Sequence, residues 1–216
     1  MIEILKQNDI EIKKYSSDCT LKELTKEIEK IESDHIKCNR CGDCCHDNVP
    51  ILGIDIIKLM RYLKLKNINK DLQFLNYPRK PHLNHRKKSL KELSQLFGLS
   101  EFEAAIFYEY NNSEPVVLCK NDKGKCIFHN NSGCSIYKIR PYICRLYHCK
   151  CGEKLSYLKE MIVSQGTWHA YYVLDWIDKE EIKHNPFLTG NTYSDILLKP
   201  FDYNIESIQH KLSVLF

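Results

Sequence analysis

Apolar residues recur at a helical period along most of the chain, and short polar stretches separate the periodic segments. Leu24 and Ile28 illustrate the spacing, because residues three and four positions apart share one face of a helix. Capping boxes begin at Thr20, Ser89 and Ser100, each followed three positions later by a glutamate. The pattern predicts helices over about residues 20–33, 55–66, 90–97, 101–110, 155–164, 168–183, 193–199 and 205–215.

Three segments depart from the helical period. Residues 1–17 alternate weakly between apolar and polar positions, which predicts a short edge strand or a flexible arm. Residues 67–88 are polar and contain two prolines, so we expect a long surface excursion there. Residues 115–128 run from PVVLC through the turn-prone NDKGK to CIFH, a pattern typical of a small β-hairpin.

Composition places the chain among globular proteins of one domain or at most two. Its 216 residues are 43% hydrophobic, which is enough to bury a core. No long apolar segment opens the chain and no run of 18 apolar residues occurs, so we expect neither a signal peptide nor a membrane partner. We therefore expect a cytoplasmic location, where cysteines serve more often as ligands or catalysts than as disulfides.

Four of the 11 cysteines crowd into the segment CNRCGDCC. Cys38, Cys41 and Cys44 are separated by two residues each, a gap that lets a tight turn aim its sulfurs at one ion. Gly42 suits such a turn because glycine adopts a positive φ without steric cost. Cys44 and Cys45 are adjacent, so both reach the same ion only with strain. The pair therefore suggests two metal centres or one polynuclear cluster.

A second group of four cysteines is spread over residues 126–149. Its members are Cys126, Cys134, Cys144 and Cys149. Their long gaps fit ligands that separate loops deliver to the site begun by the first group, rather than a zinc finger. We therefore predict all eight cysteines as metal ligands. The alternative, a free buried cysteine that packs as a small apolar side chain, is preferred for the isolated Cys19. It stays open for Cys119 and for Cys151, which is also an alternative ligand.

The charge of such a site identifies further candidate residues. Eight thiolates carry a charge of about −8, which needs compensation by metal, protons or nearby cations. Arg40, Arg140 and Arg145 lie within or beside the cysteine segments and are candidates to supply positive charge and N–H···S bonds. Three histidines are alternative ligands or acid–base groups, although an ordinary hydrogen-bonded histidine is the commoner case. They are His46, His129 and His148.

The densest basic stretch runs from Arg79 to Lys91, within a chain of net charge +4. It is either a contact surface for nucleic acid or an acidic partner, or a solvated helix face. We favour the solvated face and expect no nucleic-acid partner. A nucleic-acid complex would weaken steeply as salt rises, which separates the two interpretations.

These observations combine into one expected architecture. The fold class is mainly α (α+β), a helical domain with a cysteine-rich metal-binding insert that contains a small β-hairpin. Residues 1–37 are expected to form an N-terminal arm and helix, residues 38–152 the cysteine-cluster metal-binding domain, and residues 153–216 a C-terminal helical region. We expect the three parts to make one compact unit.

CNRCGDCC, followed downstream by KCIFHNNSGCSIYKIRPYICRLYHC, resembles the CxxCxxCC family. This YkgJ-like group is described as chelating zinc or iron and includes flagellin lysine N-methylases. The matching positions lie within about residues 38–150 and comprise the eight cysteines, Tyr137, Arg140, Pro141 and Arg145. The resemblance implies metal chelation by the cysteines and places Tyr137, Arg140 and Arg145 in the cofactor-binding set. His148 departs from the pattern, since such sequences often have proline there.

The expected cofactor is an iron–sulfur cluster or iron, with zinc as the alternative. Zinc would need two tetrahedral sites, each with four cysteine ligands, whereas an iron–sulfur cluster takes three or four cysteines. The resemblance to the methylases favours iron. No glycine-rich nucleotide motif, G-x-S-x-G or H-E-x-x-H is present. The expected function is redox or group-transfer modification of a protein or peptide at the metal. The alternative is a non-catalytic, zinc-stabilised interaction module.

Overall fold

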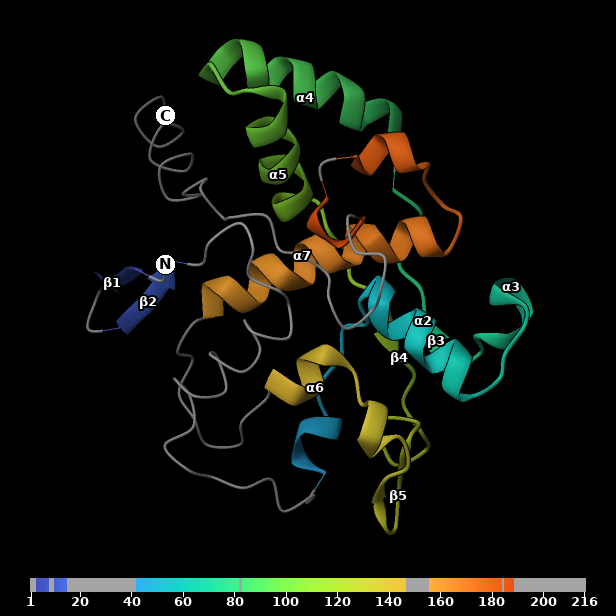
Figure 1. The fold of residues 1–216 in the computed structure, drawn as a ribbon. Helices are drawn as coiled ribbons and strands as arrows, with labels where there is room; N and C mark the ends of the chain where they lie inside the picture. The colour runs from blue at the N-terminus through green and yellow to red at the C-terminus, as the bar shows by residue number, and fades with distance from the viewer. Residues whose placement is uncertain are drawn as a thin grey trace.

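The computed structural model describes residues 3–7, 10–14, 42–81, 83–146, 156–183 and 185–188. Among these residues the longest helix is α7 (Ser156–Val173), which crosses the middle of the molecule (Figure 1). Helices α2 (Gly53–Tyr62) and α5 (Glu101–Asn111) both pack on α7, and α4 (Leu83–Phe97) packs on α5. In Figure 1, α4 and α5 lie above α7, whereas α2 and α6 (Tyr142–Leu146) lie below it.

Two glycines allow α2 and α7 to approach closely. A Cβ added at Gly53 would lie 2.4 Å from Nδ1 of His169, and one added at Gly166 would lie 2.5 Å from the side chain of Leu52. Both distances are far below van der Waals contact, so a larger residue at either position would push the helices apart. This packing explains why α7 continues through Gly166, although a glycine inside a helix costs about 1 kcal/mol.

Short antiparallel strands hold the segment that leads into α2. Strand β3 (Leu75–Asn76) pairs with β4 (Val117–Leu118), and Pro50 makes an isolated bridge to Val117. Leu118 N donates to the carbonyl of Val49 at 3.0 Å. Val49, Leu75 and Leu118 are buried in one core cluster with residues of α2 and α7. The backbone just after the first cysteine group is therefore anchored to the hydrophobic core.

Helices α4, α5 and α7 meet at a buried ion pair. Nη2 of Arg86 lies 2.7 Å from Oε1 of Glu109, and the guanidinium lies 5.3 Å from the centre of the Trp168 ring. Nε1 of Trp168 donates to the carbonyl of Glu109 at 3.2 Å. Burial raises the pKa of Glu109 to about 7, and the charge of Arg86 opposes the rise. The basic stretch from Arg79 to Lys91 is therefore not uniformly solvated, because Arg86 is part of the core.

The remaining described elements are short. Strand β1 (Glu3–Gln7) pairs with β2 (Ile10–Lys14), and β5 (His129–Asn130) pairs with β6 (Gly133–Cys134). The others are α3 (Ile68–Asp71) and the 3₁₀ turns η1 (Asp43–Cys45), η2 (Tyr137–Ile139), η3 (Lys179–Ile182) and η4 (Pro186–Leu188). No helix in the described part of the chain has the length and apolar character needed to cross a membrane.

The predicted mainly α (α+β) class is confirmed, and so are the helices predicted over 55–66 and 101–110, as α2 and α5. Three helix predictions are wrong in their limits. The helix predicted over 90–97 begins at Leu83, so Ser89 lies inside α4 and the excursion after residue 67 is shorter. The helices predicted over 155–164 and 168–183 are one helix, α7, followed by η3.

The strand predictions are partly correct. Residues 1–17 contain the β1–β2 pair, in place of a single edge strand or an arm. The NDKGK turn connects Lys120 with Cys126, and these two residues form an antiparallel bridge, as a hairpin requires. However, β4 pairs with β3 and not with CIFH, because the loop before α2 and β3 together cover both edges of β4. The helices predicted over 20–33, 193–199 and 205–215 lie outside the described residues.

His169 gives the core a defined pH dependence. Its ring is buried and stacks on Phe187 with centroids 5.9 Å apart, and burial lowers its pKa from 6.5 to about 4. The unfolded chain therefore binds a proton between these values while the folded chain does not, so the contribution of His169 to stability falls as pH drops from 6.5 to about 4. The raised pKa values of Glu109 and Asp55 act in the opposite sense over this range, so the test compares two chains. In urea unfolding we expect the parent chain to lose about 1 kcal/mol per pH unit relative to His169→Phe, and equal slopes for the two chains would contradict the assignment.

Candidate metal centre

The turn that carries Cys44 and Cys45 is tied directly to the segment that carries Cys126. A hydrogen bond of 3.0 Å from Cys45 N to the carbonyl of Gly42 closes η1. The carbonyl of Cys45 in turn accepts a hydrogen bond from Cys126 N at 2.7 Å. The bridge between Lys120 and Cys126 fixes the direction of this N–H. Backbone bonding alone therefore places cysteines of the two sequence groups side by side.

Gly42 lets the backbone of the first cysteine group pack closely against His129, which lies within the second cysteine segment. Its φ is +83°, and a Cβ added there would lie 2.2 Å from Nε2 of His129. His129 pairs with Cys134 across the β5–β6 ladder. Glycine at this position thus meets two needs, a left-handed backbone and room for an imidazole ring.

Lys120 holds the chain where it leaves the first cysteine group. Its Nζ donates to three successive carbonyls, those of Cys45 at 3.1 Å, of His46 at 2.6 Å and of Asp47. These bonds use all three donors of the ammonium group, and bonds from a charged donor are the stronger kind. The same charge acts on the thiols: burial raises the pKa of Cys126, and Lys120 partly offsets the rise.

Five thiols lie close enough to alter one another's ionisation. Burial raises the pKa of Cys45, and the thiolates of Cys126 and Cys134 raise it further. Burial also raises the pKa of Cys126, with Cys134 and Cys44 adding to the effect. The largest rise is at Cys144, where burial acts together with the thiolates of Cys44, Cys126 and Cys134. A bound cation would favour the thiolates and reverse these effects.

Asp55 connects α2 with the helix that carries Cys144. Its Oδ2 accepts from Leu52 N at 3.3 Å, at the start of α2, and its Oδ1 accepts from Tyr142 N at 3.0 Å, at the start of α6. The side chain is buried, and burial raises its pKa to about 6 although the Tyr142 N–H opposes the rise. Cys144 lies two residues after Tyr142, so the carboxylate of Asp55 orients the turn that positions this thiol.

The residues predicted to bind a cofactor lie on the same segment. The Arg140 guanidinium stands 4.6 Å from the centre of the Tyr137 ring, and that of Arg145 stands 5.3 Å from the centre of the Tyr142 ring. Nε of Arg145 is buried and has no hydrogen-bond partner among the described residues. A buried donor of this kind calls for an acceptor. Arg145 therefore fits beside an anionic group, which a thiolate-ligated metal would be.

The structure describes five of the eight predicted ligand cysteines, namely Cys44, Cys45, Cys126, Cys134 and Cys144, and the charges of these thiols affect one another's pKa. Their role as metal ligands stays a prediction. The other three predicted ligands, Cys38, Cys41 and Cys149, lie outside the described residues. So do four further candidate residues from the sequence analysis, which are Cys19, Cys151, Arg40 and His148. Within the described ranges alone, no three Cys, His, Asp or Glu side chains are arranged to hold one ion. Among the described residues no cysteine, Cys119 included, forms a disulfide. Cys119 faces elsewhere, since its Sγ lies 3.7 Å from the carbonyl of Gln73.

A group of thiols on a helical scaffold defines a candidate metal-chelating protein. The family comparison agrees: residues 37–162 match the CxxCxxCC family, described as a "Putative zinc- or iron-chelating domain". The match covers more than half of the chain, which therefore belongs to this family. No curated protein and no solved structure shows significant similarity to the chain.

Replacing Lys120 tests how firmly the cysteine turn is held. Lys120→Met keeps the apolar stem and removes the donors to three carbonyls, so we expect metal binding to weaken about tenfold. The free energy of unfolding should fall by about 1–2 kcal/mol. Lys123→Met, at an exposed position of the same turn, is the control. Competition with a chelator measures the affinities, and equal values for the two variants would show that Lys120 does not support the centre.

Proposed function

We propose that the two cysteine segments together hold one polynuclear, thiolate-ligated metal centre. The observation that carries the proposal is the backbone hydrogen bond of 2.7 Å from Cys126 N to the carbonyl of Cys45, which joins the two cysteine segments directly. The effect of Cys44 and Cys126 on the pKa of Cys144 agrees with it. In this proposal Cys38, Cys41 and Cys149 complete the ligand set. Eight thiolates exceed the four that one tetrahedral ion accepts.

We infer that the metal is iron, as bound iron or as an iron–sulfur cluster. The all-thiol donor set suits iron as well as zinc. The C-x2-C-x2-C opening, with Cys38, Cys41 and Cys44, has the spacing of bacterial ferredoxin loops and favours iron. When bound, such a centre supplies redox chemistry or a Lewis acid. The chain's own contribution is to compensate the charge of the thiolates through Lys120 and Arg145.

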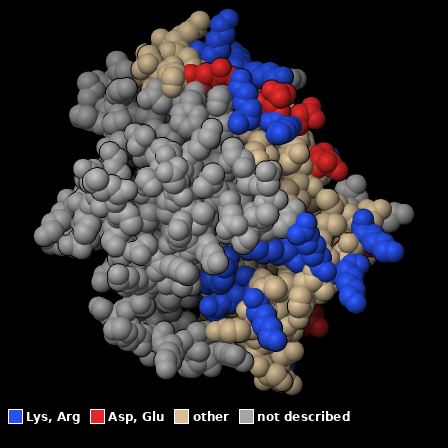
Figure 2. Space-filling view, in the orientation of Figure 1, with Lys and Arg blue, Asp and Glu red and all other residues tan. Residues whose placement is uncertain are grey.

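The activity that we propose is redox or group-transfer modification of a protein or peptide. Cys44, Cys45 and Cys134 are only partly buried, so a large substrate can approach the centre from solvent. Lysine and arginine side chains gather over the part of the surface where α2 and α6 lie, whereas basic and acidic side chains are mixed near α4 (Figure 2). A basic surface attracts an acidic segment of a partner. The resemblance to flagellin lysine N-methylases supports group transfer.

The short elements of residues 119–146 favour a second candidate, a zinc-stabilised interaction module without catalysis. In this stretch the described strands have two residues each, and α6 has five. Segments of this kind gain stability when a metal cross-links them, because metal binding and folding are coupled. The two candidates share the ligands and differ in the metal.

Metal analysis of protein purified without oxygen separates the two candidates. We expect a brown protein with broad visible absorption, containing iron and, for a cluster, acid-labile sulfide. The spectrum should bleach on reduction with dithionite. Colourless protein with stoichiometric zinc would reject the iron proposal and leave the interaction module. Protein that binds neither metal after reconstitution would reject both.

A further inference from the structure

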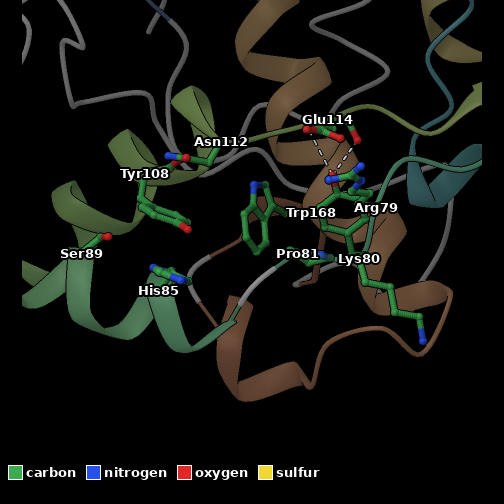
Figure 3. A pocket seen from close by; sticks show the side chains of 10 residues that line it. Arg79, Lys80, Pro81, His85, Ser89, Tyr108, Asn112, Glu114 and Trp168 are labelled. Atoms are coloured by element: carbon green, nitrogen blue, oxygen red, sulfur yellow. Dashed lines mark hydrogen bonds between the residues drawn. The ribbon is translucent and has the colours of Figure 1, made fainter.

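A second candidate site lies on the other side of α7 from the cysteines. A cavity of about 460 Å³ opens between α4, α5, α7 and the loop before α4. Its lining comprises Arg79, Lys80, Pro81, His85, Ser89, Tyr108, Asn112, Glu114, Trp168 and Tyr171. Figure 3 shows Trp168 between two walls, one from α4 and α5 with His85 and Tyr108, the other from the loop with Arg79 and Lys80. The volume is typical of a small-molecule site.

The aromatic part of this cavity is held in place by the core. The hydroxyl of Tyr171 donates to the carbonyl of Glu114 at 2.6 Å and accepts from Glu114 N at 3.1 Å. Trp168 is fixed by its bond to the carbonyl of Glu109 and by the guanidinium of Arg86 near its ring. Tyr108 completes the aromatic lining, 6.1 Å from Trp168 between ring centres. A ligand therefore meets a preformed aromatic wall and loses little free energy in ordering it.

The rim of the cavity is positively charged. Arg79 and Lys80 are exposed, and among the described residues neither has a carboxylate within ion-pair distance. Lys80 Nζ lies 5.8 Å from the centre of the Trp176 ring, at the edge of the aromatic group. Among the lining residues that the structure describes, Glu114 is the single carboxylate, against two permanent cations and one histidine. The charge favours an anion.

From these features we propose that the cavity binds a small anion that carries a flat ring. The ring packs against the half-buried Tyr108, next to the buried side chains of Trp168 and Tyr171, and the anionic group, a phosphate or a carboxylate, pairs with the exposed Arg79 and Lys80. Arg79 suits this role because a guanidinium binds either group through two parallel hydrogen bonds. The site is separate from the cysteine centre, and its occupation does not depend on the metal.

Intrinsic fluorescence tests the proposal, because both tryptophans of the chain report on this cavity. Trp168 lines it, and Trp176 stacks on Tyr171 with centroids 5.6 Å apart. The probes are AMP, with adenosine and inorganic phosphate as its two halves, and benzoate, with benzyl alcohol as its neutral analogue. We expect saturable quenching by AMP, by benzoate or by both, at least tenfold tighter than by any of the control compounds. AMP alone would identify a phosphate ligand, and benzoate alone a carboxylate.

Arg79→Gln is the test variant and Lys123→Gln its matched control, since both positions are exposed. We expect Arg79→Gln to weaken binding of the anion about tenfold, the loss of one charge-assisted pair, with Lys123→Gln unchanged. No saturable quenching by either anion up to about 1 mM would overturn the proposal. So would equal binding of the neutral analogues, or an Arg79→Gln variant that binds as tightly as the parent chain. Metal content is measured separately, so this failure would leave the cysteine centre untouched.

Discussion

Gly42→Ala is expected to lower the free energy of unfolding by about 3 kcal/mol and to abolish tight metal binding. Two costs add at this position. The backbone has φ +83°, where an L side chain is strained, and the new methyl group would meet Nε2 of His129 at 2.2 Å. Either the imidazole or the cysteine turn has to move. Because β5 also fixes Cys134, movement of His129 would disturb both cysteine groups.

Gly124→Ala is the matched control for this experiment. Gly124 also has a positive φ, +70°, but a Cβ there meets no heavy atom within 4 Å. Only the backbone strain remains, so we expect a loss of about 1 kcal/mol and normal metal content. Adding His129→Ala to Gly42→Ala removes the clashing atoms and should restore part of the stability. Equal effects of Gly42→Ala and Gly124→Ala in thermal unfolding would show that contact with His129 is unimportant.

Asp55→Ala is expected to cost about 3 kcal/mol and to reduce metal occupancy. The substitution leaves the N–H groups of Leu52 and Tyr142 buried without an acceptor. The first loss affects the start of α2, and the second releases the turn that carries Cys144. Denaturant unfolding and metal analysis of the same preparation measure the two effects together.

Asp71→Ala provides a comparison with the same bonding pattern at the surface. Oδ2 of Asp71 accepts from Lys66 N at 3.0 Å and from Asn67 N at 2.8 Å, both solvent-exposed bonds. Water can replace this carboxylate, so we expect a loss of about 1 kcal/mol and no change in metal content. If Asp55→Ala were no more harmful than Asp71→Ala, the carboxylate of Asp55 would not be what holds α6 in place.

The sequence predicts the helices well where local pattern decides, as for α2 and α5. It fails where packing decides. Gly166 is a helix breaker by propensity, yet it lies inside α7 because α2 needs the space. Ser89 has the signature of a helix cap, yet α4 already begins at Leu83. The turn of the predicted hairpin forms, but tertiary contacts give β4 a different partner.

The cysteine cluster is predictable because soft ligands at short spacing have few other uses. Its supporting residues are harder to find. Asp55 gives one signal in the sequence, because it is an acidic residue at the start of the helix predicted over 55–66. The sequence gives no signal for the role of Lys120, because a lysine beside a turn is ordinarily solvated. The role of Gly42 was partly predicted: the positive φ follows from the turn, but the contact with His129 depends on the fold.

Metal content of three serine variants tests the central claim most directly. Cys44→Ser lies in the first group, Cys144→Ser in the second, and Cys119→Ser, whose thiol faces Gln73, is the control. If one shared centre exists, Cys44→Ser and Cys144→Ser should each lose most of the metal while Cys119→Ser retains it. Two variants that each lose about half of the metal, or either one with full content, would show that the cysteine groups do not share a centre.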